Sequence, residues 1–307
     1  MLKPSSAPGP DKIHPRLLRE CSRELATPLS LVFEKSLTEG ILPADWKSTN
    51  VTPIYKKGRK SSAVNYRPIN LASVPCKVME SIIKDEVMAH LLNNNLIRHS
   101  QHGFLPGRSC TTNLVEYMNI VTKTLDKGGS FDAILVDFEK AFDRVPFDGM
   151  LSKCAAHGIS GDLFRWLKNW TEGRRQRVVL NGVASNWADV LSSVVQGSVL
   201  GPILFLIYIN DLDDAVMEDD NNIYISKFAD DTKIGREIVS YDDSAKLQGG
   251  IDRLVQWCRD WGMSLHPGSA LFFGSNNPNI LIDGMKINSK NIARDLGVYI
   301  SDTCDTS

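Results

Sequence analysis

Three aspartates at the ends of apolar, strand-like runs constrain this chain more than any other feature. Asp137 ends the run Phe131–Val136, and the pair Asp230 and Asp231 separates two further runs. Those two runs are Ile223–Phe228 and Thr232–Arg236. Because strand-like runs joined by a short polar turn predict a β-hairpin, we expect both carboxylates of the pair at a hairpin tip. Adjacent carboxylates repel each other, and beside a sheet they are costly unless a cation neutralises them.

The acidic pair alone has two interpretations. Hard carboxylate oxygens in small number suit Mg²⁺, which keeps several waters and takes further ligands from substrate phosphates. Two such ions about 4 Å apart would activate an attacking hydroxyl and stabilise a leaving oxygen. Alternatively, Asp230 and Asp231 are simply favourable turn residues, since Asp is common at hairpin tips.

The rest of the pattern predicts an α+β fold with an antiparallel sheet. Helix-like apolar spacing covers 16–37, 77–92, 110–126, 147–157, 161–172, 198–210 and 243–261. Asn181-Gly182 and Asp283-Gly284 predict two more hairpin turns, and Thr49–Tyr55 and Leu296–Ile300 are predicted strands. Helices and strands do not alternate as they do in a doubly wound sheet. The sequence has no GxGxxG or GxxxxGK[ST] segment, which leaves dinucleotide and P-loop functions without support.

The charge of the chain is close to zero but unevenly spread. The formal net charge is −1, whereas nucleic-acid enzymes usually carry an excess of Lys and Arg. The basic residues form two clusters, Lys56, Lys57, Arg59 and Lys60 followed by Arg174, Arg175 and Arg177. A near-zero sum can therefore hide a basic groove. There is no membrane-length apolar run, no signal-peptide pattern and no CxxC pair, so we expect an intracellular protein with reduced thiols and no membrane association.

An ordered set of motifs resembles the reverse transcriptases of non-LTR retrotransposons. Asp137–Asp143 resembles their motif A, Gln196–Pro202 their motif B and Phe228–Asp231 their motif C. Two finger motifs and the primer grip are similar to Asn65–Ile69, Gln101–Phe104 and Leu296–Val298. The set follows the family's order across nearly the whole chain and is most similar to the jockey-like branch of LINE elements.

The resemblance implies a right-hand polymerase fold and an RNA-directed DNA polymerase activity. A primer 3′-OH would attack the α-phosphate of a dNTP on an RNA template, with two Mg²⁺ ions, or Mn²⁺ in their place. Asp137, Asp230 and Asp231 would be catalytic and hold the metals, together with the backbone carbonyl of Phe138. The implied partners are the RNA template, a DNA primer and dNTPs.

Further roles follow from the same resemblance. Phe142 would be the steric gate that rejects a ribose 2′-OH. The remaining nucleotide contacts would come from Gln196, Gly197, Arg67, Lys56 and Lys57. Template and primer contacts would come from Phe104, Arg108, Leu296 and Gly297. Lys56 and Lys57 could equally belong to a solvated loop, and Arg108 could be an ordinary surface charge.

We expect fingers and N-terminal helices over 1–127, a palm segment with motif A over 128–145, insertion helices and a hairpin over 146–190, and the rest of the palm over 191–307. We also expect the helical thumb to be missing, so that the chain represents a truncated piece. His266 and Ser269 stand where the family usually has an Asn and a Lys. Loss of that Lys would remove a general acid, a contribution of about 10²–10⁴-fold.

Two rivals remain at this stage. A catalytically impaired remnant would at most bind nucleic acid, and the replacement by Ser269 favours it, whereas the three intact aspartates do not. A metal-dependent phosphodiesterase would need a further His or Glu beside the acids, and the sequence offers neither at a suitable spacing.

Overall fold

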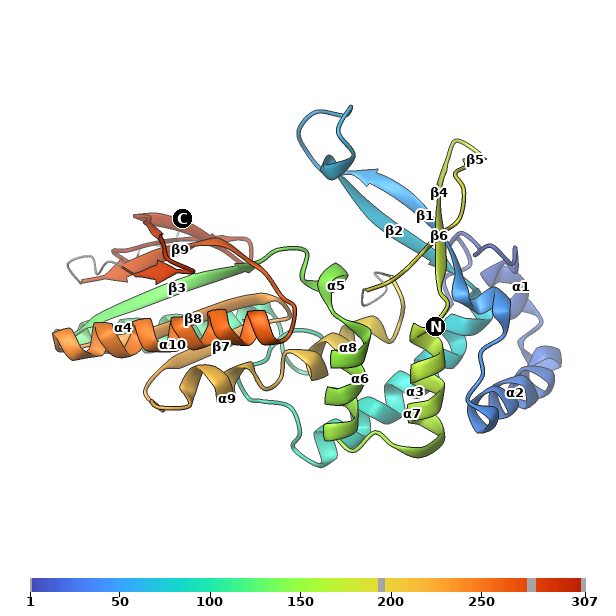
Figure 1. The fold of residues 1–307 in the computed structure, drawn as a ribbon, viewed down its shortest axis with the longest axis horizontal. Helices are drawn as coiled ribbons and strands as arrows, with labels where there is room; N and C mark the ends of the chain where they lie inside the picture. The colour runs from blue at the N-terminus through green and yellow to red at the C-terminus, as the bar shows by residue number, and fades with distance from the viewer. Residues whose placement is uncertain (1, 193–196, 275–279, 305–307) are drawn as a thin grey trace. The chain divides into compact units, whose positions relative to one another are not determined.

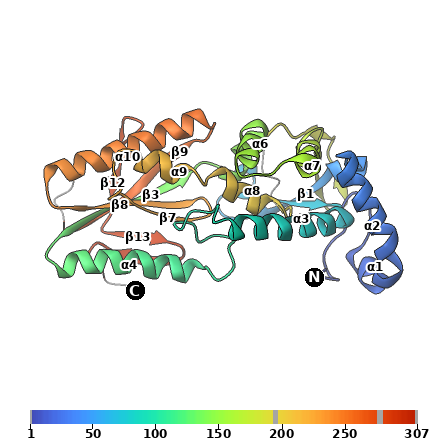
Figure 2. The ribbon, with the colours of Figure 1, turned by 90° about the horizontal axis from the view of Figure 1, so that it is seen from below.

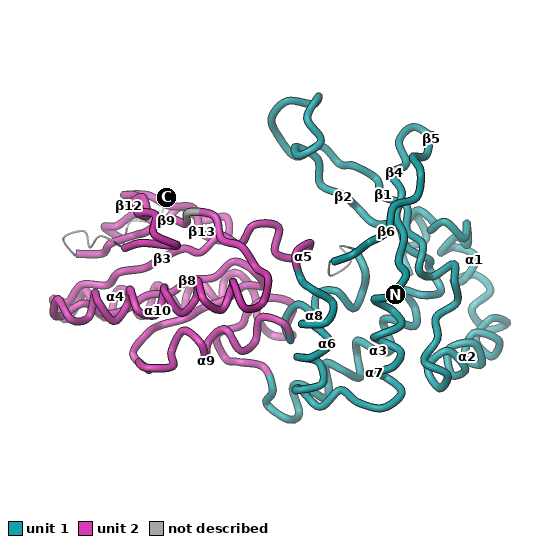
Figure 3. Tube along the Cα trace, viewed as in Figure 1, with its two compact units in different colours: residues 1–96, 145–207 teal, residues 97–144, 208–307 magenta. Residues whose placement is uncertain are grey.

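The computed structural model describes residues 2–192, 197–274 and 280–304, and the chain divides into two compact units (Figures 1 and 3). Unit 1 consists of residues 1–96 and 145–207, and unit 2 of residues 97–144 and 208–307. Neither unit is continuous in sequence. Residues 97–127 belong to the same compact unit as the motif A strand, and 191–207 belong to the other unit. The expected boundaries of fingers and palm stay a prediction.

Unit 2 is built on a sheet with helices on both faces, and the sheet is antiparallel except for its edge strand β12, which pairs with β9 in parallel. The sheet order is β12-β9-β3-β8-β7, formed by Asn288–Ser289, Leu265–Phe273, Ser130–Phe138, Asp231–Ile238 and Tyr224–Phe228. Helix α10 (Tyr241–Asp260) lies on one face and helix α4 (Cys110–Asp126) on the other (Figure 2). Central strand β3 is therefore covered on both sides, which explains its nearly continuous apolar sequence.

The smaller elements of unit 2 complete its edges. They are α5 (Ala141–Arg144), α9 (Leu212–Met217), β10 (Leu281–Ile282), β11 (Met285–Lys286), β13 (Ile292–Asp295) and β14 (Val298–Ser301). The β13–β14 hairpin packs over the α4 side, where its Ala293 and Ile300 join Tyr117 and Phe131 in a buried apolar cluster. This core fixes the sheet whose ends carry the acidic residues.

Unit 1 combines a twisted sheet with a group of helices. Its sheet runs β2-β1-β4-β5, with β6 also paired to β4, from Tyr66–Ala72, Ser48–Tyr55, Arg175–Leu180, Val183–Ala184 and Ala188–Asp189. Its helices are α1 (Pro15–Glu20), α2 (Ser22–Glu39), α3 (Val74–Asn93), α6 (Phe147–Ala156), α7 (Gly161–Thr171) and α8 (Gly201–Tyr208), with 3₁₀ turns at Ala44–Lys47 and Ala63–Asn65. Trp166 and Trp170 of α7 are spaced i, i+4, and both are fully buried in the core of this unit.

Most of the predicted elements are present, and the exceptions have local causes. The turns at Asn181-Gly182 and Asp283-Gly284 are confirmed, and each Asn or Asp there has the positive φ that such turns require. The strand predicted over Leu296–Ile300 is wrong at its start, because Leu296 and Gly297 both have positive φ and form the turn between β13 and β14. Among the described residues, no helix is long and apolar enough to cross a membrane.

Candidate active site

The motif A strand and the motif C hairpin bring the three aspartates to one end of the unit 2 sheet. Strand β3 pairs with β8 so that Val136 lies opposite Thr232, and one step beyond that pair stand Asp137 and Asp231. Strand β7 pairs with β8 up to Phe228 opposite Asp231, which confirms the predicted hairpin. Side chains of neighbouring antiparallel strands lie about 5 Å apart at their β-carbons. The sequence-distant acids are therefore neighbours.

The turn that carries Asp230 is held by a residue from a different segment. Ala229 has φ +58°, a left-handed conformation that is strained for a residue with a β-carbon. Its N–H donates to the side-chain Oε1 of Gln101 at 2.9 Å, and the N–H of Gly103 donates to the same oxygen at 2.8 Å. A β-carbon on Gly103 would lie 2.4 Å from the nitrogen of Ala229, so only glycine fits. The side chain of Gln101 is buried, and the two hydrogen bonds that it accepts hold the turn in place.

The backbone around Gln101 also attaches to strand β7. The N–H of His102 donates to the carbonyl of Lys227, and the N–H of Lys227 donates to the carbonyl of Ser100, both at 2.7 Å. The segment 100–103 therefore supports the motif C hairpin directly. The sequence motif Gln101–Phe104 was expected among the fingers, and its position under the hairpin explains why its pattern includes Gln and Gly.

The electrostatics of the acidic residues fit a bound cation. Burial, with a smaller part from the Asp137 carboxylate, raises the pKa of Asp230. Burial, followed by repulsion from Asp230, Asp295 and Asp137, raises the pKa of Asp231 to about 6. Carboxylates that oppose each other's ionisation in this way are stabilised by a divalent ion.

A cleft of about 430 Å³ opens beside these residues within unit 2. Asp137 and Asp231 line it together with Ser269, Lys290 and Arg294. Within the ranges that the structure describes, no three His, Cys, Asp or Glu side chains are grouped closely enough to hold one metal ion. The donor set nevertheless fits Mg²⁺, because that ion takes few protein carboxylates and fills its remaining positions with water and phosphate oxygens.

A β-bulge aims Asp137 at this cleft. The pairing of β3 with β9 shifts between Leu135, which lies opposite Ser269, and Asp137, which lies opposite His266. A β-carbon on Gly268 would lie 2.4 Å from the carbonyl oxygen of Leu135, so the bulge depends on this glycine. Of the two positions at which the sequence departs from the motif pattern that it resembles, His266 thus lies opposite Asp137 and Ser269 lies opposite Leu135.

Two buried lysines support the hairpin, and sequence patterns did not identify either. The ammonium of Lys233 lies 2.5 Å from a carboxylate oxygen of Asp295 and 2.5 Å from Oδ1 of Asn113, above the ring of Tyr117. Lys227 is fully buried and pairs with Asp213. Consecutive residues are buried along the middle of β7 and β8, which accounts for the burial of both lysines. Their partners come from distant segments and could not be read from the local pattern.

The structure brings several other expected contact residues together in unit 2. The rings of Phe104 and Phe142 meet edge to face with centroids 6.3 Å apart. Leu296 lines the same cleft as Asp137, and Gly297 follows it in the hairpin turn. The backbone of Phe138 ends strand β3.

The guanidinium of Arg108, which we expected to contact the template, makes contacts with its own chain. Its Nη1 donates to the carbonyl of His99 at 2.5 Å and lies 3.1 Å from Nε2 of the buried His102. The guanidinium thus contacts its own chain, and its role at template phosphate stays a prediction.

The remaining expected residues lie in unit 1. Arg67 is exposed on β2, and Lys56 and Lys57 are exposed just after β1. Gln196 lies outside the described residues. Gly197 has φ +89°, and a β-carbon there would lie 3.1 Å from the carbonyl oxygen of Asn70.

Glu80 is a residue of unit 1 that sequence reasoning missed. It is fully buried on α3, and its carboxylate accepts from the N–H of Val199 at 2.7 Å and from the indole of Trp170 at 2.9 Å. The buried Arg174 stacks on Trp170 with 4.8 Å between its guanidinium carbon and the ring centroid. A buried carboxylate thus anchors the segment that follows Gly197.

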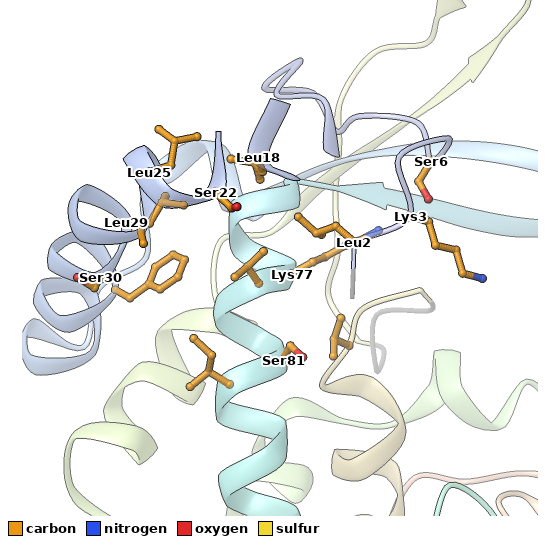
Figure 4. A pocket seen from close by; sticks show the side chains of 15 residues that line it. Leu2, Lys3, Ser6, Leu18, Ser22, Leu25, Leu29, Ser30, Lys77 and Ser81 are labelled. Carbon is orange, nitrogen blue, oxygen red and sulfur yellow. The ribbon is translucent and has the colours of Figure 1, made fainter. Parts of the chain in front are cut away.

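A larger pocket of about 650 Å³ in unit 1 has a different character (Figure 4). It lies among the N-terminal segment, α1, α2 and α3, and its walls are mainly apolar, with Leu18, Leu25 and Leu29 among them. No carboxylate, imidazole or thiol is found among the described residues that line it. The chemistry of the molecule therefore concentrates at the acidic cleft.

Comparisons with known proteins agree with this site. The sequence matches the family of reverse transcriptases (RNA-dependent DNA polymerases) over residues 54–274, more than half of the chain. The RNA-directed DNA polymerase from mobile element jockey of Drosophila funebris is 28% identical, covering 97% of this chain and 34% of that protein. The probable RNA-directed DNA polymerase from transposon X-element of Drosophila melanogaster is 26% identical, covering 96% of this chain and 33% of that protein. The chain thus spans about a third of the length of these relatives.

The fold has a counterpart among solved structures. Apo telomerase from Candida tropicalis, truncated from its C-terminal domain, superposes with a TM-score of 0.61 at 12% identity, over 92% of this chain and 60% of that one. This likeness confirms the predicted α+β, right-hand polymerase fold, and the sequence relatives confirm the resemblance to jockey-like non-LTR elements. The chain belongs to the reverse transcriptase family.

Proposed function

We propose that this chain is the RNA-directed DNA polymerase part of a non-LTR retrotransposon protein, adding nucleotides from dNTPs to a primer 3′-OH on an RNA template. The observation that carries the proposal is the neighbourhood of three carboxylates, with mutual repulsion that a cation would relieve: Asp137 and Asp231 line one cleft, and Asp230 adjoins Asp231 in the hairpin turn. RNA and dNTPs are intracellular, so we place the activity inside the cell.

In this proposal the two units have different roles in the polymerase reaction. Unit 2 would act as the palm and unit 1 as the fingers. Asp137, Asp230 and Asp231 would hold two Mg²⁺ ions, with the carbonyl of Phe138 as a further ligand. When bound, these ions would lower the pKa of the attacking hydroxyl and stabilise the negative charge of the leaving pyrophosphate.

Residues of the chain would then select and orient the substrates. The ring of Phe142 would exclude a ribose 2′-OH, supported from the side by Phe104. Triphosphate charge would be neutralised by Arg67, Lys56 and Lys57, and the nucleotide would be lined by Gln196 and Gly197. Arg108, Leu296 and Gly297 would contact template and primer.

The test is dNTP incorporation on an oligo(dT)-primed RNA template with and without Mg²⁺. Replacement of Asp230 and Asp231 by Asn preserves their size and removes their charge, so we expect incorporation to vanish in that variant. Asp214→Asn, at an exposed acid of the same unit, is the matched control and should incorporate like the unchanged chain. Metal-independent incorporation, or incorporation that survives the double replacement, would refute the proposal.

A binding-only remnant is the second candidate, and one observation favours it. Ser269 lines the cleft at the position where a lysine was expected, and a hydroxyl is a poor proton donor. Well-folded protein that binds a primed RNA without extending it would support this alternative.

A further inference from the structure

The sheet of unit 1 has one face that gathers arginines. Strand β1 pairs in parallel with β4, with Asn50 opposite Arg177, and antiparallel with β2, with Ile54 opposite Arg67. Residues opposite each other share a face, and so do residues two apart on a strand. Arg67, Arg175 and Arg177 therefore lie on the same face of this sheet, spread over strands β2 and β4.

Arg67 and Arg175 are exposed on this face, and Arg177 is half-buried. Thr49 and Val51 of β1 point to the opposite side and are buried, whereas Ile54 and Arg67 are exposed. Trp187 directly precedes β6, whose Ala188 and Asp189 pair with β4. The indole is 36% exposed, an uncommon position for so large an apolar ring unless it has a polar or aromatic partner to meet.

Two guanidinium groups converge on that single indole. The guanidinium carbon of Arg177 lies 4.4 Å from the ring centroid of Trp187, and that of Arg175 lies 5.7 Å away. The Nε of Arg177 also donates to Oδ1 of Asn50 at 2.9 Å. Stacking and this hydrogen bond fix the orientation of Arg177 and use one of its five N–H donors. Its terminal donors are thus presented in a set direction.

The positive charge on this face is only partly compensated by the chain. Asp189 stands opposite Arg175 on the neighbouring strand, but across the described ranges no ion pair joins Arg67, Arg175 or Arg177 to a carboxylate. Like charges held near one another repel, and an anionic partner would relieve that repulsion. A phosphate matches the planar fork of an arginine, and the face of an indole matches the face of a base.

We propose that Arg175, Arg177 and Trp187, named here the arginine–tryptophan face, bind an unpaired strand of RNA. The two arginines contact consecutive phosphates, and the indole stacks on one base. The strand must be unpaired, because bases inside a duplex do not offer their faces to a side chain. The inference rests on the proposed function for its choice of RNA, and it assigns a contact surface beyond the cleft and the nucleotide-binding residues.

Binding of a fluorescein-labelled oligouridylate, followed by fluorescence anisotropy without dNTP or divalent metal, tests the proposal. Removing both guanidinium groups with Arg175→Ala and Arg177→Ala should weaken binding by about tenfold or more, and should reduce the slope of log affinity against log salt by about 1.4, or about 0.7 for each lost phosphate contact. Trp187→Ala should weaken binding by about five- to a hundredfold, the range measured for loss of one stacked base.

Two further variants separate stacking and location from general effects. Trp187→Phe keeps an aromatic platform and should restore most of the affinity lost in Trp187→Ala. The pair Arg19→Ala and Arg23→Ala removes the same charge from exposed positions on α1 and α2 of the same unit, and should leave affinity nearly unchanged. Thermal unfolding of each variant confirms that the fold is retained.

The proposal is overturned if the unchanged chain does not bind the oligouridylate, if the Arg175 and Arg177 variant binds as well as the unchanged chain, or if the Arg19 and Arg23 control loses as much. It is also overturned if Trp187→Phe binds as weakly as Trp187→Ala. Because the assay contains no dNTP or metal, its result is independent of polymerisation. Failure to incorporate nucleotides with intact RNA binding at this face would refute the proposed activity alone.

Discussion

At the scale of single residues, the acidic hairpin is a strained turn held by one amide. Ala229 adopts a backbone conformation that costs of order 1 kcal/mol for a residue other than glycine. Gln101 offsets this by accepting two backbone N–H groups at a site closed to water. The position of Asp230 is therefore set by a side chain that lies 128 residues before Ala229 in the sequence.

Replacement of that amide should loosen the turn. Gln101→Ala leaves the N–H groups of Gly103 and Ala229 without an acceptor, and we expect the free energy of unfolding to fall by about 2–3 kcal/mol. Urea unfolding followed by circular dichroism measures this loss. The matched variant Gln256→Ala removes an exposed amide of the same unit and should cost well under 1 kcal/mol. Equal losses in the two variants would contradict the role of Gln101.

The repulsion among the acidic residues should also lower the melting temperature of the metal-free protein. In metal-free buffer at neutral pH, Asp231→Asn removes a charge that Asp230, Asp295 and Asp137 oppose, so we expect the melting temperature to rise. Added Mg²⁺ should raise the melting temperature of the unchanged chain and have a smaller effect on this variant, because a ligand that binds only the folded state stabilises it. Differential scanning calorimetry with and without Mg²⁺ measures both effects. A variant less stable than the unchanged chain in metal-free buffer would contradict this account.

At the scale of elements, two adjacent glycines within helix α10 have different surroundings. A β-carbon on Gly250 would lie 2.6 Å from Cδ1 of Ile223, whereas one on Gly249 would meet nothing closer than the tip of Arg253 at 3.5 Å. Gly250 is thus needed for the close approach of α10 to its neighbours. Gly249 only weakens the helix.

Opposite effects of alanine are expected at these two positions. Gly249→Ala should raise the free energy of unfolding by about 1 kcal/mol, since alanine is the better helix former. Gly250→Ala should lower it by about 1–3 kcal/mol despite the same gain in propensity, because the new methyl overpacks the interface. Each variant is the control for the other in urea unfolding. Stabilisation by both would show that Ile223 can move aside at little cost.

Local sequence patterns predicted the helices, strands and turns of this fold better than they predicted which distant segments contact one another. Asn181-Gly182 and Asp283-Gly284 were predictable as turns, because few residues other than Asn, Asp and Gly adopt positive φ easily. Leu296 adopts positive φ as well, and its apolar side chain gives no sign of it, so the turn there was missed.

The candidate site shows the same limit. Asp137, Asp230 and Asp231 could be found from strand ends and family motifs. The hydrogen bonds that Gln101 and Glu80 accept join segments far apart in the sequence, so no local pattern indicated them. Buried lysines are rare enough that Lys227 and Lys233 gave no local signal of their ion pairs.

At the scale of the whole molecule, each unit is assembled from two separate stretches of chain. In unit 1, Glu80 of the first stretch accepts hydrogen bonds from Trp170 and Val199 of the second. The hydroxyl of Ser36 likewise accepts from the indole of Trp166 at 3.0 Å. The core of unit 1 therefore cannot form from the first stretch alone.

A fragment of residues 1–96 should accordingly lack a stable fold. It would expose the surface that α6, α7 and α8 cover and leave Glu80 without its partners. We expect circular dichroism of the fragment to show no cooperative thermal transition, in contrast to the full chain. A cooperative transition would show that helices α1, α2 and α3 with strands β1 and β2 suffice as a core.

Because the chain alternates between the two units, a deletion in the gene easily damages both of them. The chain passes from one unit to the other after residues 96, 144 and 207. An in-frame deletion that spans one of these crossings removes parts of both units at once. A gene copy shortened in this way would therefore encode neither unit intact. No complete unit would remain on which selection could act.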